Sequence, residues 1–242
     1  MKHEIILDKK ELGERTLKDH KVRKHKLYSE LAIGKELLDV GFAEFANPFL
    51  KNPIGIDVQD VEKPRNYKNV YRVNMNKESF PFRDKRFDSV IAGEVIEHVE
   101  NPSHVLRECN RVLKKGGKFI VSTPHACYYW EIIRNLFFSS IPSIDVGEHL
   151  SNWNILDFER LLIKNGFCIK KKYGSVLIIR IPFGEGRIKV PMRRFHKLSW
   201  IVVYECVKEK EADSRIYTRS KIDPKNAYYG SITPGVVKIE NE

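Results

Sequence analysis

The sequence lacks the segments that direct a chain into or across a membrane. Its first residues do not follow the basic-then-apolar order of a signal peptide, and no uncharged apolar run is long enough to span a bilayer. It has only four cysteines, which are widely spaced and form no C-x-x-C pair, so the common zinc and redox motifs are absent. We therefore expect a cytoplasmic protein with reduced, buried thiols and no transmembrane segment.

The composition is that of a folded protein with a mixed, basic surface. The 242 residues suffice for one α/β domain with extensions, and a hydrophobic content of 42% excludes a disordered chain. The net charge is +11, with basic residues concentrated in 15–26, 170–172 and 187–197. Because acidic residues are also abundant, this pattern is typical of a solvated surface. We therefore expect a small-molecule or glycan partner, with nucleic acid as the less favoured alternative.

Short apolar runs alternate with helical periodicity from residue 37 onward, which is typical of βαβ units around a parallel sheet. Five strands are predicted in this part of the chain, at residues 37–40, 54–58, 70–73, 89–92 and 118–122. Two later strands, near 169–181 and 200–207, would close the sheet as an antiparallel edge hairpin. The predicted fold class is a doubly wound, mostly parallel seven-stranded α/β sheet.

Two helices carry clear end signals. The first starts after Asn101, a residue suited to an N-cap, and the glycines at 116–117 suit its exit. Its apolar face has helical spacing and consists of Val105, Leu106, Cys109, Val112 and Leu113. The second helix is predicted at 155–165, between Asn154 and Gly166.

The remaining segments divide the chain into parts. Residues 1–36 are predicted to be a charged helical lead-in, 37–207 the main domain, and 208–242 a polar C-terminal tail. An aromatic segment at 127–150 interrupts the domain directly after a predicted strand end. A cover over a binding cleft is favoured there, because such folds bind ligands at strand ends; a homo-oligomer surface and a membrane-contacting patch are the alternatives.

A turn of small residues follows the first predicted strand, around Gly41. In a doubly wound sheet such a turn lets the backbone approach a nucleotide-like cofactor closely. Asp57 ends the second predicted strand, eighteen positions after Asp39, which fits one βαβ step. A carboxylate at this place can accept hydrogen bonds from both hydroxyls of a ribose. The pattern predicts a nucleotide-like cofactor at these strand ends.

Five sequence blocks occur in a fixed order and spacing. They are Leu38-Asp39-Val40-Gly41, then Gly55-Ile56-Asp57-Val58, then Phe80-Pro81-Phe82 with Phe87-Asp88-Ser89-Val90, then Glu94-Val95-Ile96-Glu97-His98-Val99, and finally Val112-Leu113-Lys114-Lys115-Gly116-Gly117 with Ser122-Thr123-Pro124. With these blocks, residues 37–167 resemble the class I S-adenosylmethionine-dependent methyltransferases, in particular their small bacterial and archaeal members. The resemblance implies a Rossmann-like fold, S-adenosylmethionine as cofactor and methyl transfer as the activity.

The resemblance also implies roles for individual residues toward the cofactor. Asp39 and Gly41 would shape the methionine pocket, Asp57 would hold the ribose, Asn74 and Met75 would border the adenine, and Gly93 and Glu94 would line the methionine side; Ala43 and Val58 belong to the same predicted site.

Two positions of the glycine-rich turn depart from the family pattern. The family usually has glycine where this chain has Ala43 and Phe45. A phenylalanine there would crowd the following helix against the strand or narrow the pocket. A catalytically silent methyltransferase-like partner subunit is therefore an alternative to an enzyme.

Histidines near the predicted strand ends are candidates for a general base. His125 follows the fifth strand at the Ser122-Thr123-Pro124 block, and an oxygen acceptor usually gains from a base that titrates near neutral pH. His98 and His149 are rival bases. In the alternative interpretation, His125 only caps a loop.

The E-x-x-E-H pattern at Glu94, Glu97 and His98 resembles the metal-binding segment of two subgroups, the ubiquinone-pathway O-methyltransferases and the small-RNA ribose 2′-O-methyltransferases. His149 would supply a further ligand, so these four side chains would hold a divalent ion that orients the acceptor and lowers its pKa. In the alternative interpretation, Glu97 and His98 only cap the following loop.

The methyl acceptor is the least determined part of the prediction. The aromatic segment favours a partly apolar acceptor, and the basic stretches favour a phosphate-bearing one. We expect O-methylation of a small molecule, lipid or glycan, with RNA ribose methylation as the alternative, because no aromatic platform for RNA is evident.

Overall fold

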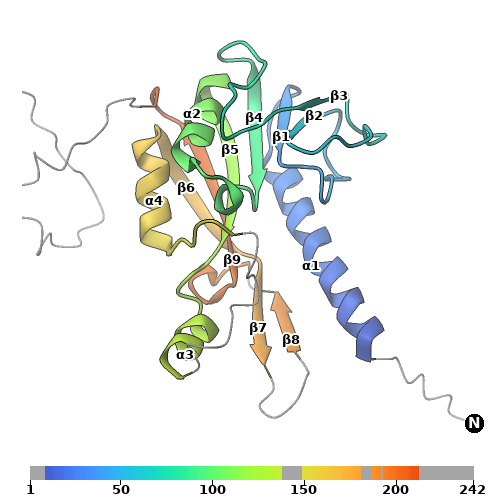
Figure 1. Ribbon diagram of the computed structural model, residues 1–242, viewed down its shortest axis with the longest axis vertical. Helices are drawn as coiled ribbons and strands as arrows, with labels where there is room; N and C mark the ends of the chain where they lie inside the picture. The colour runs from blue at the N-terminus through green and yellow to red at the C-terminus, as the bar shows by residue number, and fades with distance from the viewer. Residues whose placement is uncertain (1–8, 138–148, 181–186, 192, 213–242) are drawn as a thin grey trace, which may run out of the picture.

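The computed structural model describes residues 9–137, 149–180, 187–191 and 193–212. Its centre is a seven-stranded sheet of order β3-β2-β1-β4-β5-β9-β6 (Figure 1). The strands are β1 (Leu37–Val40), β2 (Ile54–Asp57), β3 (Asn69–Arg72), β4 (Phe87–Gly93), β5 (Leu113–Pro124), β6 (Phe167–Gly174) and β9 (Ile201–Lys208). Strands β1 to β5 pair in parallel, whereas β9 is antiparallel to both of its neighbours. The predicted mostly parallel α/β fold is confirmed.

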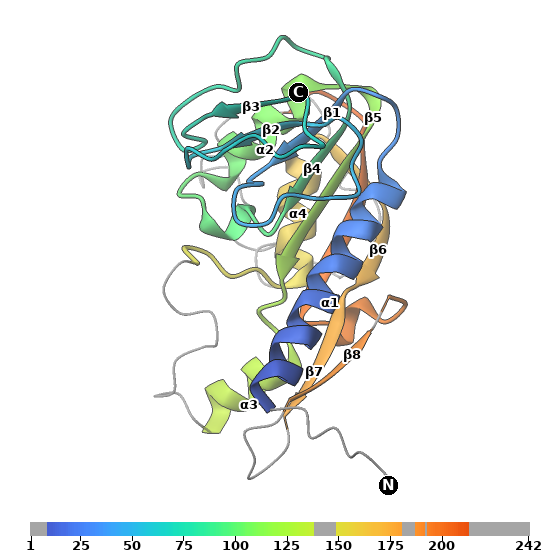
Figure 2. The same cartoon turned by 90° about the vertical axis from the view of Figure 1, so that its right-hand side faces the viewer.

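Helices cover both faces of the sheet. Helix α1 (Lys9–Leu31) lies on one face, and α2 (Pro102–Val112) and α4 (Ile155–Lys164) lie on the other (Figure 2). Because successive side chains of a strand point to opposite faces, β4 sends Val90 into the core under α2 and α4 and Ile91 into the core under α1. The sheet is therefore buried on both sides, as its apolar strands predict.

The capping signals place the helix starts correctly. The Asn101 side chain accepts a hydrogen bond from the backbone N–H of His104, and Asn154 accepts one from the N–H of Asp157. Gly166 follows α4 with φ at +86°, a backbone conformation that favours glycine. The predicted exit of α2 is wrong: the helix ends at Val112, and residues 116–117 lie inside β5.

The connections after β1 and β2 differ from the predicted βαβ pattern. Residues 41–53 and 58–68 contain no helix. Pro48 and Pro53 disfavour a helix in the first loop, since proline lacks an N–H donor and restricts the residue before it. Hydrogen bonds hold this loop instead: the Asn66 side chain donates to the carbonyls of Asn47 and Leu50, at 2.9 and 3.0 Å.

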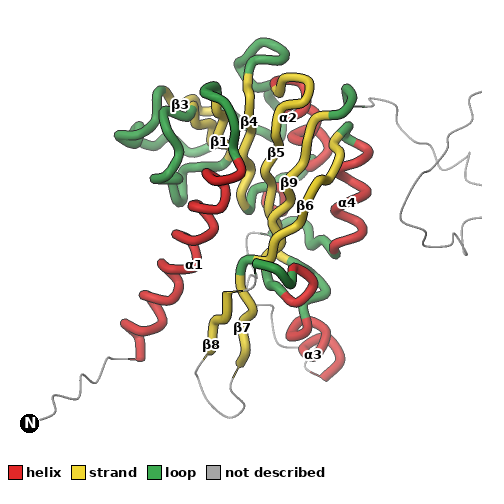
Figure 3. The backbone as a smooth tube through the Cα atoms, turned by 180° about the vertical axis from the view of Figure 1, so that it is seen from behind, coloured by secondary structure: helices red, strands yellow, loops and turns green. Residues whose placement is uncertain are grey.

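A second, two-stranded sheet extends beyond the ends of β5, β6 and β9 (Figure 3). It consists of β7 (Val176–Arg180) and β8 (Arg187–Pro191), and α3 (Tyr129–Phe137) lies beside it. The single strand predicted at 169–181 is therefore broken, at Ser175, whose N–H donates to the Ser199 hydroxyl at 2.8 Å.

Some predicted features lie outside the described residues, namely parts of the lead-in (1–8), the aromatic cover (138–148) and the tail (213–242). Among the described helices, none has both the length and the apolar character needed to cross a bilayer. All four cysteines are free, but Cys127 is exposed and Cys168 only half-buried, so the prediction of buried thiols holds for Cys109 and Cys206 alone.

Docking of α1 gives a stability prediction. Tyr28 is buried, and its hydroxyl shares a 2.6 Å hydrogen bond with the Ser122 hydroxyl. Tyr28→Ala should lower the free energy of unfolding by about 3–5 kcal/mol, because it leaves a cavity under the helix. Urea denaturation would measure this, with the exposed Val22→Ala as the control on the same helix. Equal effects of the two substitutions would show that α1 does not dock on the sheet.

Candidate functional site

Two adjoining cavities lie at the edge of the sheet where β1, β2, β4 and β5 end. The first, of about 220 Å³, is bounded by residues of α1, the loop after β1, the segment after β4, and the ends of β5 and β9. The second, of about 290 Å³, extends over the ends of β2 and β3. Both are lined by Gly41, Glu44, Glu94 and His98. Joined at these residues, they reach the size of a small-molecule site, about 300–1,000 Å³.

Gly41 forms the floor where the cavities meet. Its φ is +72°, and a Cβ atom there would lie 2.3 Å from Val95. Only glycine satisfies both constraints, and the bare backbone leaves room for a ligand to approach closely. The structure therefore has the close-approach turn that the sequence predicts after the first strand.

Asp57 lies at the end of β2 and lines the second cavity, together with Val58, Asn74 and Met75. Its carboxylate accepts hydrogen bonds from the backbone N–H groups of Ala43 (2.9 Å) and Gln59 (3.0 Å). Each carboxylate oxygen has a further lone pair, so the group retains acceptor capacity toward ribose hydroxyls. Ala43 is not among the cavity-lining residues, and its N–H orients Asp57.

Asp39 lies behind this turn and lines neither cavity. Its carboxyl is buried and accepts a 2.5 Å hydrogen bond from the Tyr67 hydroxyl. Burial raises the pKa of Asp39 to about 7, against the lowering effect of that hydrogen bond. In this arrangement Asp39 supports the loop that follows it.

The N-terminal helix contributes a wall of the first cavity, which the sequence interpretation missed. Lys21, Lys24 and His25 of α1 all line it. Burial, together with the charge of Lys24, lowers the pKa of His25 to about 4, so this imidazole is neutral at pH 7. The sequence did hold a signal for this wall. Lys24 lies three and four positions before Leu27 and Tyr28, which pack α1 on the sheet, so it shares their face of the helix.

Phe45 has a different role from the one predicted. No helix follows the turn, so Phe45 does not press a helix against a strand. It is 38% exposed and lines the first cavity, where its ring packs edge-on against His25 with centroids 5.0 Å apart. The Lys21 ammonium lies 5.3 Å from the centroid of the Phe45 ring. The substituted glycine position thus supplies an aromatic wall.

Glu94 forms an ion pair with Lys24 where the two cavities meet. Burial raises the pKa of the Glu94 carboxyl, but the charge and hydrogen bond of Lys24, together with the charges of His20 and Lys21, lower it, and the net pKa lies below its ordinary value. Glu94 is therefore ionised at neutral pH. Its backbone has a φ of +58°. The neighbouring Gly93 has an ordinary backbone, but a Cβ atom there would lie 2.7 Å from the Tyr28 ring.

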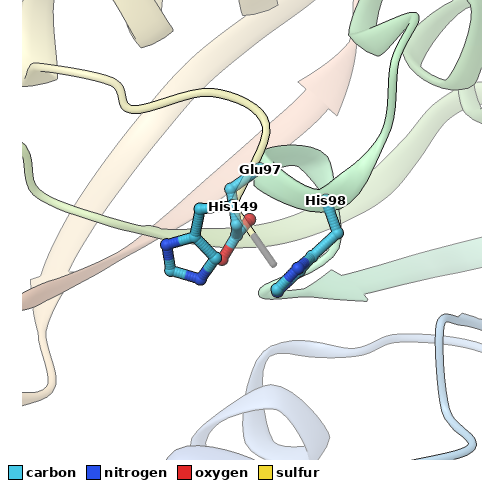
Figure 4. Close-up of side chains that lie close together, drawn as sticks. All are labelled: Glu97, His98 and His149. Carbon is cyan, nitrogen blue, oxygen red and sulfur yellow. The ribbon is translucent and has the colours of Figure 1, made fainter. Parts of the chain in front are cut away.

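Glu97, His98 and His149 come together beside the first cavity (Figure 4). One potential ligand atom from each lies within 4.8 Å of the others. The short helix η1 (Ile96–His98) carries the first two, and backbone N–H groups of Leu150 and Ser151 donate to the Glu97 carbonyl at 2.8 and 3.1 Å. These bonds fix the segment that carries His149.

This donor set fits a divalent ion, because two imidazoles and a carboxylate are ligands that zinc, manganese and ferrous ions accept. Three of the four predicted ligands are thus adjacent. The fourth, Glu94, is not part of the group, since its carboxylate pairs with Lys24.

His125 follows β5 as predicted, but it is buried and lines neither cavity. Its neighbours Pro124 and Trp200 line the first cavity instead, and its backbone N–H donates to the Trp200 carbonyl at 2.8 Å. Burial lowers the pKa of the His125 imidazole. Of the three histidines predicted as bases, His98 and His149 line the cavity and His125 does not.

The chain is similar to known methyltransferases. Residues 38–121 match the family described as "Methyltransferase domain". A S-adenosylmethionine-dependent methyltransferase from Thermotoga maritima has the same fold, with a TM-score of 0.58, 19% identity, and 81% of this chain and 94% of that one covered. An uncharacterized protein of Methanocaldococcus jannaschii is 35% identical over 85 residues, which cover 35% of this chain and 41% of that protein. The mitochondrial ubiquinone biosynthesis O-methyltransferase of Rattus norvegicus is 29% identical over 110 residues, covering 44% of this chain and 32% of that one.

The fold and the site define a Rossmann-like methyltransferase domain. Residues 38–121 match a methyltransferase domain, and the fold is that of S-adenosylmethionine-dependent methyltransferases, as the five sequence blocks predict. The chain's match spans less than half the length of each of these two curated relatives. The residues that line the second cavity fit the cofactor. Gly41 provides a turn without a side chain, and Asp57 provides a carboxylate that accepts hydrogen bonds.

The position of Asp57 predicts an effect on cofactor affinity. Asp57→Asn should weaken binding of S-adenosylmethionine about 10-fold or more, since a hydrogen bond to a charged group contributes about 1.5–3 kcal/mol. Titration calorimetry would measure the dissociation constant, with Asp60→Asn, an exposed position three residues later, as the control. Unchanged affinity in the Asp57 variant would show that the ribose of the cofactor binds elsewhere.

The raised pKa of Asp39 predicts a pH-dependent stability. Between pH 4 and pH 7 the unfolded chain ionises this carboxyl while the folded protein keeps it protonated, so ionisation favours unfolding. The contribution of Asp39 to stability should therefore be full below pH 4 and fall by up to about 1.4 kcal/mol per pH unit toward pH 7. Asp39→Asn should flatten this part of the profile. Parallel urea-denaturation profiles of the two proteins over this range would contradict the assignment.

Proposed function

We propose that this protein transfers the methyl group of S-adenosylmethionine to a hydroxyl oxygen of a small-molecule, lipid or glycan acceptor. The observation that carries the proposal is the position of the Glu97-His98-His149 group. It borders the first cavity, and His98 also lines the second, where Asp57 lies. An acceptor in the first cavity would have its reacting atom beside both the group and the cofactor.

The chemistry of methyl transfer explains why such a group is useful. The reaction is an in-line displacement, so the protein contributes mainly by aligning the acceptor atom with the methyl carbon. A hydroxyl is a weak nucleophile until its proton is removed, whereas a basic amine needs no such help. A group able to take or displace a hydroxyl proton therefore favours an oxygen acceptor.

Glu97, His98 and His149 are the residues that would hold a divalent ion. A bound ion would supply Lewis-acid chemistry that lowers the pKa of the acceptor hydroxyl. The buried Glu97 carboxylate would contribute negative charge and fix the imidazole beside it, and His98 would orient the hydroxyl toward the second cavity. Without an ion, His98 is the better-placed base, since His125 does not line the cavity.

The walls of the first cavity favour a compact, partly apolar acceptor. Phe45 and Trp200 line it from different segments, and Pro124 adds a further apolar surface. A volume of about 220 Å³ suits a single ring or sugar unit better than a stacked run of nucleotides. The O-methyltransferase among the relatives is consistent with a hydroxyl acceptor.

The proposal predicts transfer that depends on the acidic residue of the group. Labelled methyl transfer from S-adenosylmethionine would be followed on a panel of phenols, catechols, amines and glycans, after treatment with a chelator and after addition of magnesium, manganese or zinc. Transfer should require a hydroxyl, fall on chelation and return with metal. Glu97→Gln should reduce kcat about 100-fold or more, because the acceptor hydroxyl loses its activation.

Glu100→Gln is the matched control, since this exposed glutamate lies only three residues away. Activity that is indifferent to the chelator and to Glu97→Gln would overturn the metal role and leave a histidine as the base. Transfer to amines alone would overturn the oxygen acceptor.

A further inference from the structure

A third cavity lies at the opposite edge of the sheet, where the parallel strands begin. It has a volume of about 500 Å³ and is lined by four basic side chains and one acidic one, namely Glu36, Lys68, Arg83, Arg86 and Lys114. Glu36, Lys68 and Arg86 each come directly before a strand, β1, β3 and β4 respectively. Because parallel strands start at the same edge, the fold gathers these charges from distant parts of the chain. We call this third cavity the basic cavity.

The basic cavity is separate from the two cavities at the other edge. Strand β4 begins next to Arg86 and ends at Gly93, which lines the first cavity (Figure 1). The seven residues of this strand, at about 3.3 Å each, place the two edges about 20 Å apart. A small acceptor that lies beside His98 cannot reach the basic cavity, so its charges are not part of the methyl-transfer site.

Carboxylates offset only part of the positive charge in the basic cavity. Glu36 pairs with both Lys68 and Arg86, and Lys114 pairs with Asp88 at 2.6 Å. The two distances to Glu36 are 3.8 Å, so Glu36 does not hold the donors of Lys68 and Arg86 in hydrogen bonds. The four basic side chains thus face two carboxylates. The excess of positive charge favours a ligand that carries several negative charges.

Aromatic rings hold Arg86 in place. The centre of its guanidinium lies 4.9 Å from the centroid of the Phe82 ring and 5.0 Å from that of the Phe87 ring. Both rings are buried. A guanidinium fixed on rings presents its N–H groups in a set direction, and its planar fork suits the paired oxygens of a phosphate.

The loop that carries Arg83 and Arg86 is also fixed. The backbone N–H groups of Lys85 and Arg86 donate to the carbonyls of Arg111 and Val112, at 3.0 and 2.8 Å. Lys85 has a φ of +55°, a conformation that favours glycine, and strained residues of this kind cluster at ligand sites. The basic side chains of this loop are therefore positioned before a ligand binds, which lowers the entropic cost of binding.

We propose that the basic cavity binds an oligophosphate, a compact anion with several adjacent phosphate groups. The two arginines would bind phosphate oxygens in pairs, and the two lysines would add point charges. None of the five lining residues is aromatic, so a nucleobase would have no ring to stack on and the phosphates would provide the recognition. This site goes beyond the proposed function and does not depend on it.

Titration calorimetry of the full chain with sodium tripolyphosphate, at constant ionic strength, would test the proposal. Arg83→Gln and Lys68→Gln should each weaken binding about 10-fold, because each removes a hydrogen bond between charged groups. Sulfate should bind about 10-fold more weakly than tripolyphosphate or worse, since one small anion contacts fewer of the basic side chains. Uridine triphosphate separates the two sources of the ligand: equal affinity assigns a free oligophosphate, and tighter binding assigns a nucleotide.

Lys115→Gln is the matched control, since this exposed lysine lies next to Lys114 but does not line the cavity. It should change the affinity by about 2-fold or less, and urea denaturation would report whether each variant is folded. Equal weakening by Lys115→Gln, or equal affinity for sulfate and tripolyphosphate, would show nonspecific charge attraction and overturn the proposal. Absence of tripolyphosphate binding by the wild-type protein would also overturn it. So would equally tight binding of hexauridylate, whose phosphates are separated by riboses.

Discussion

The contact between Tyr28 and the ends of β4 and β5 is the interaction on which the site depends. The Tyr28 ring occupies the space that a side chain at position 93 would need, and its hydroxyl bonds to Ser122 at the end of β5. Glycine at 93 is thus required by a residue 65 positions earlier in the chain. Because the helix is rigid, this one contact fixes Lys21, Lys24 and His25 one to two turns away, over the first cavity.

The loop after β1 replaces the helix usual at this place in doubly wound folds, and polar side chains give it shape. The Tyr67 hydroxyl donates to Asp39 and accepts from the N–H of Asn47, while the Asn47 side chain donates to the His25 carbonyl. This chain of hydrogen bonds joins β1, the loop and α1. Such a network is strong only when each polar group in it has a hydrogen-bond partner. The hydrogen bond from Tyr67 therefore offsets part of the cost of burying the Asp39 carboxyl.

The parts of the molecule that depend on local pattern were predictable from the sequence. Apolar runs located β1, β2, β4 and β5, and asparagine caps located the starts of α2 and α4, because these signals act within a few residues. The helix expected after β1 was wrong, since Pro48 and Pro53 outweigh the family pattern there. The position of Lys24 at the first cavity was not predictable from the lead-in alone, because it requires Tyr28 to contact Ser122 across 94 positions. The approach of His149 to Glu97 was expected only through resemblance, and it depends on backbone hydrogen bonds that no pattern specifies.

The segment that follows β4 carries two carboxylates with different partners, Glu94 beside Lys24 and Glu97 beside His98 and His149. At Glu94 the positive φ directs the side chain toward Lys24 and the boundary of the cavities. The 3₁₀ turn of η1 follows, and its Glu97 and His98 lie beside His149 instead. If Glu94 had joined the metal group, a second carboxylate would have lain beside Glu97, and Lys24 would have remained a buried, unpaired charge. The ion pair therefore keeps two carboxylates that lie three positions apart in separate roles. In the proposed reaction, this separation lets one short segment hold the methyl donor and activate the hydroxyl, with the two aligned by the backbone between them.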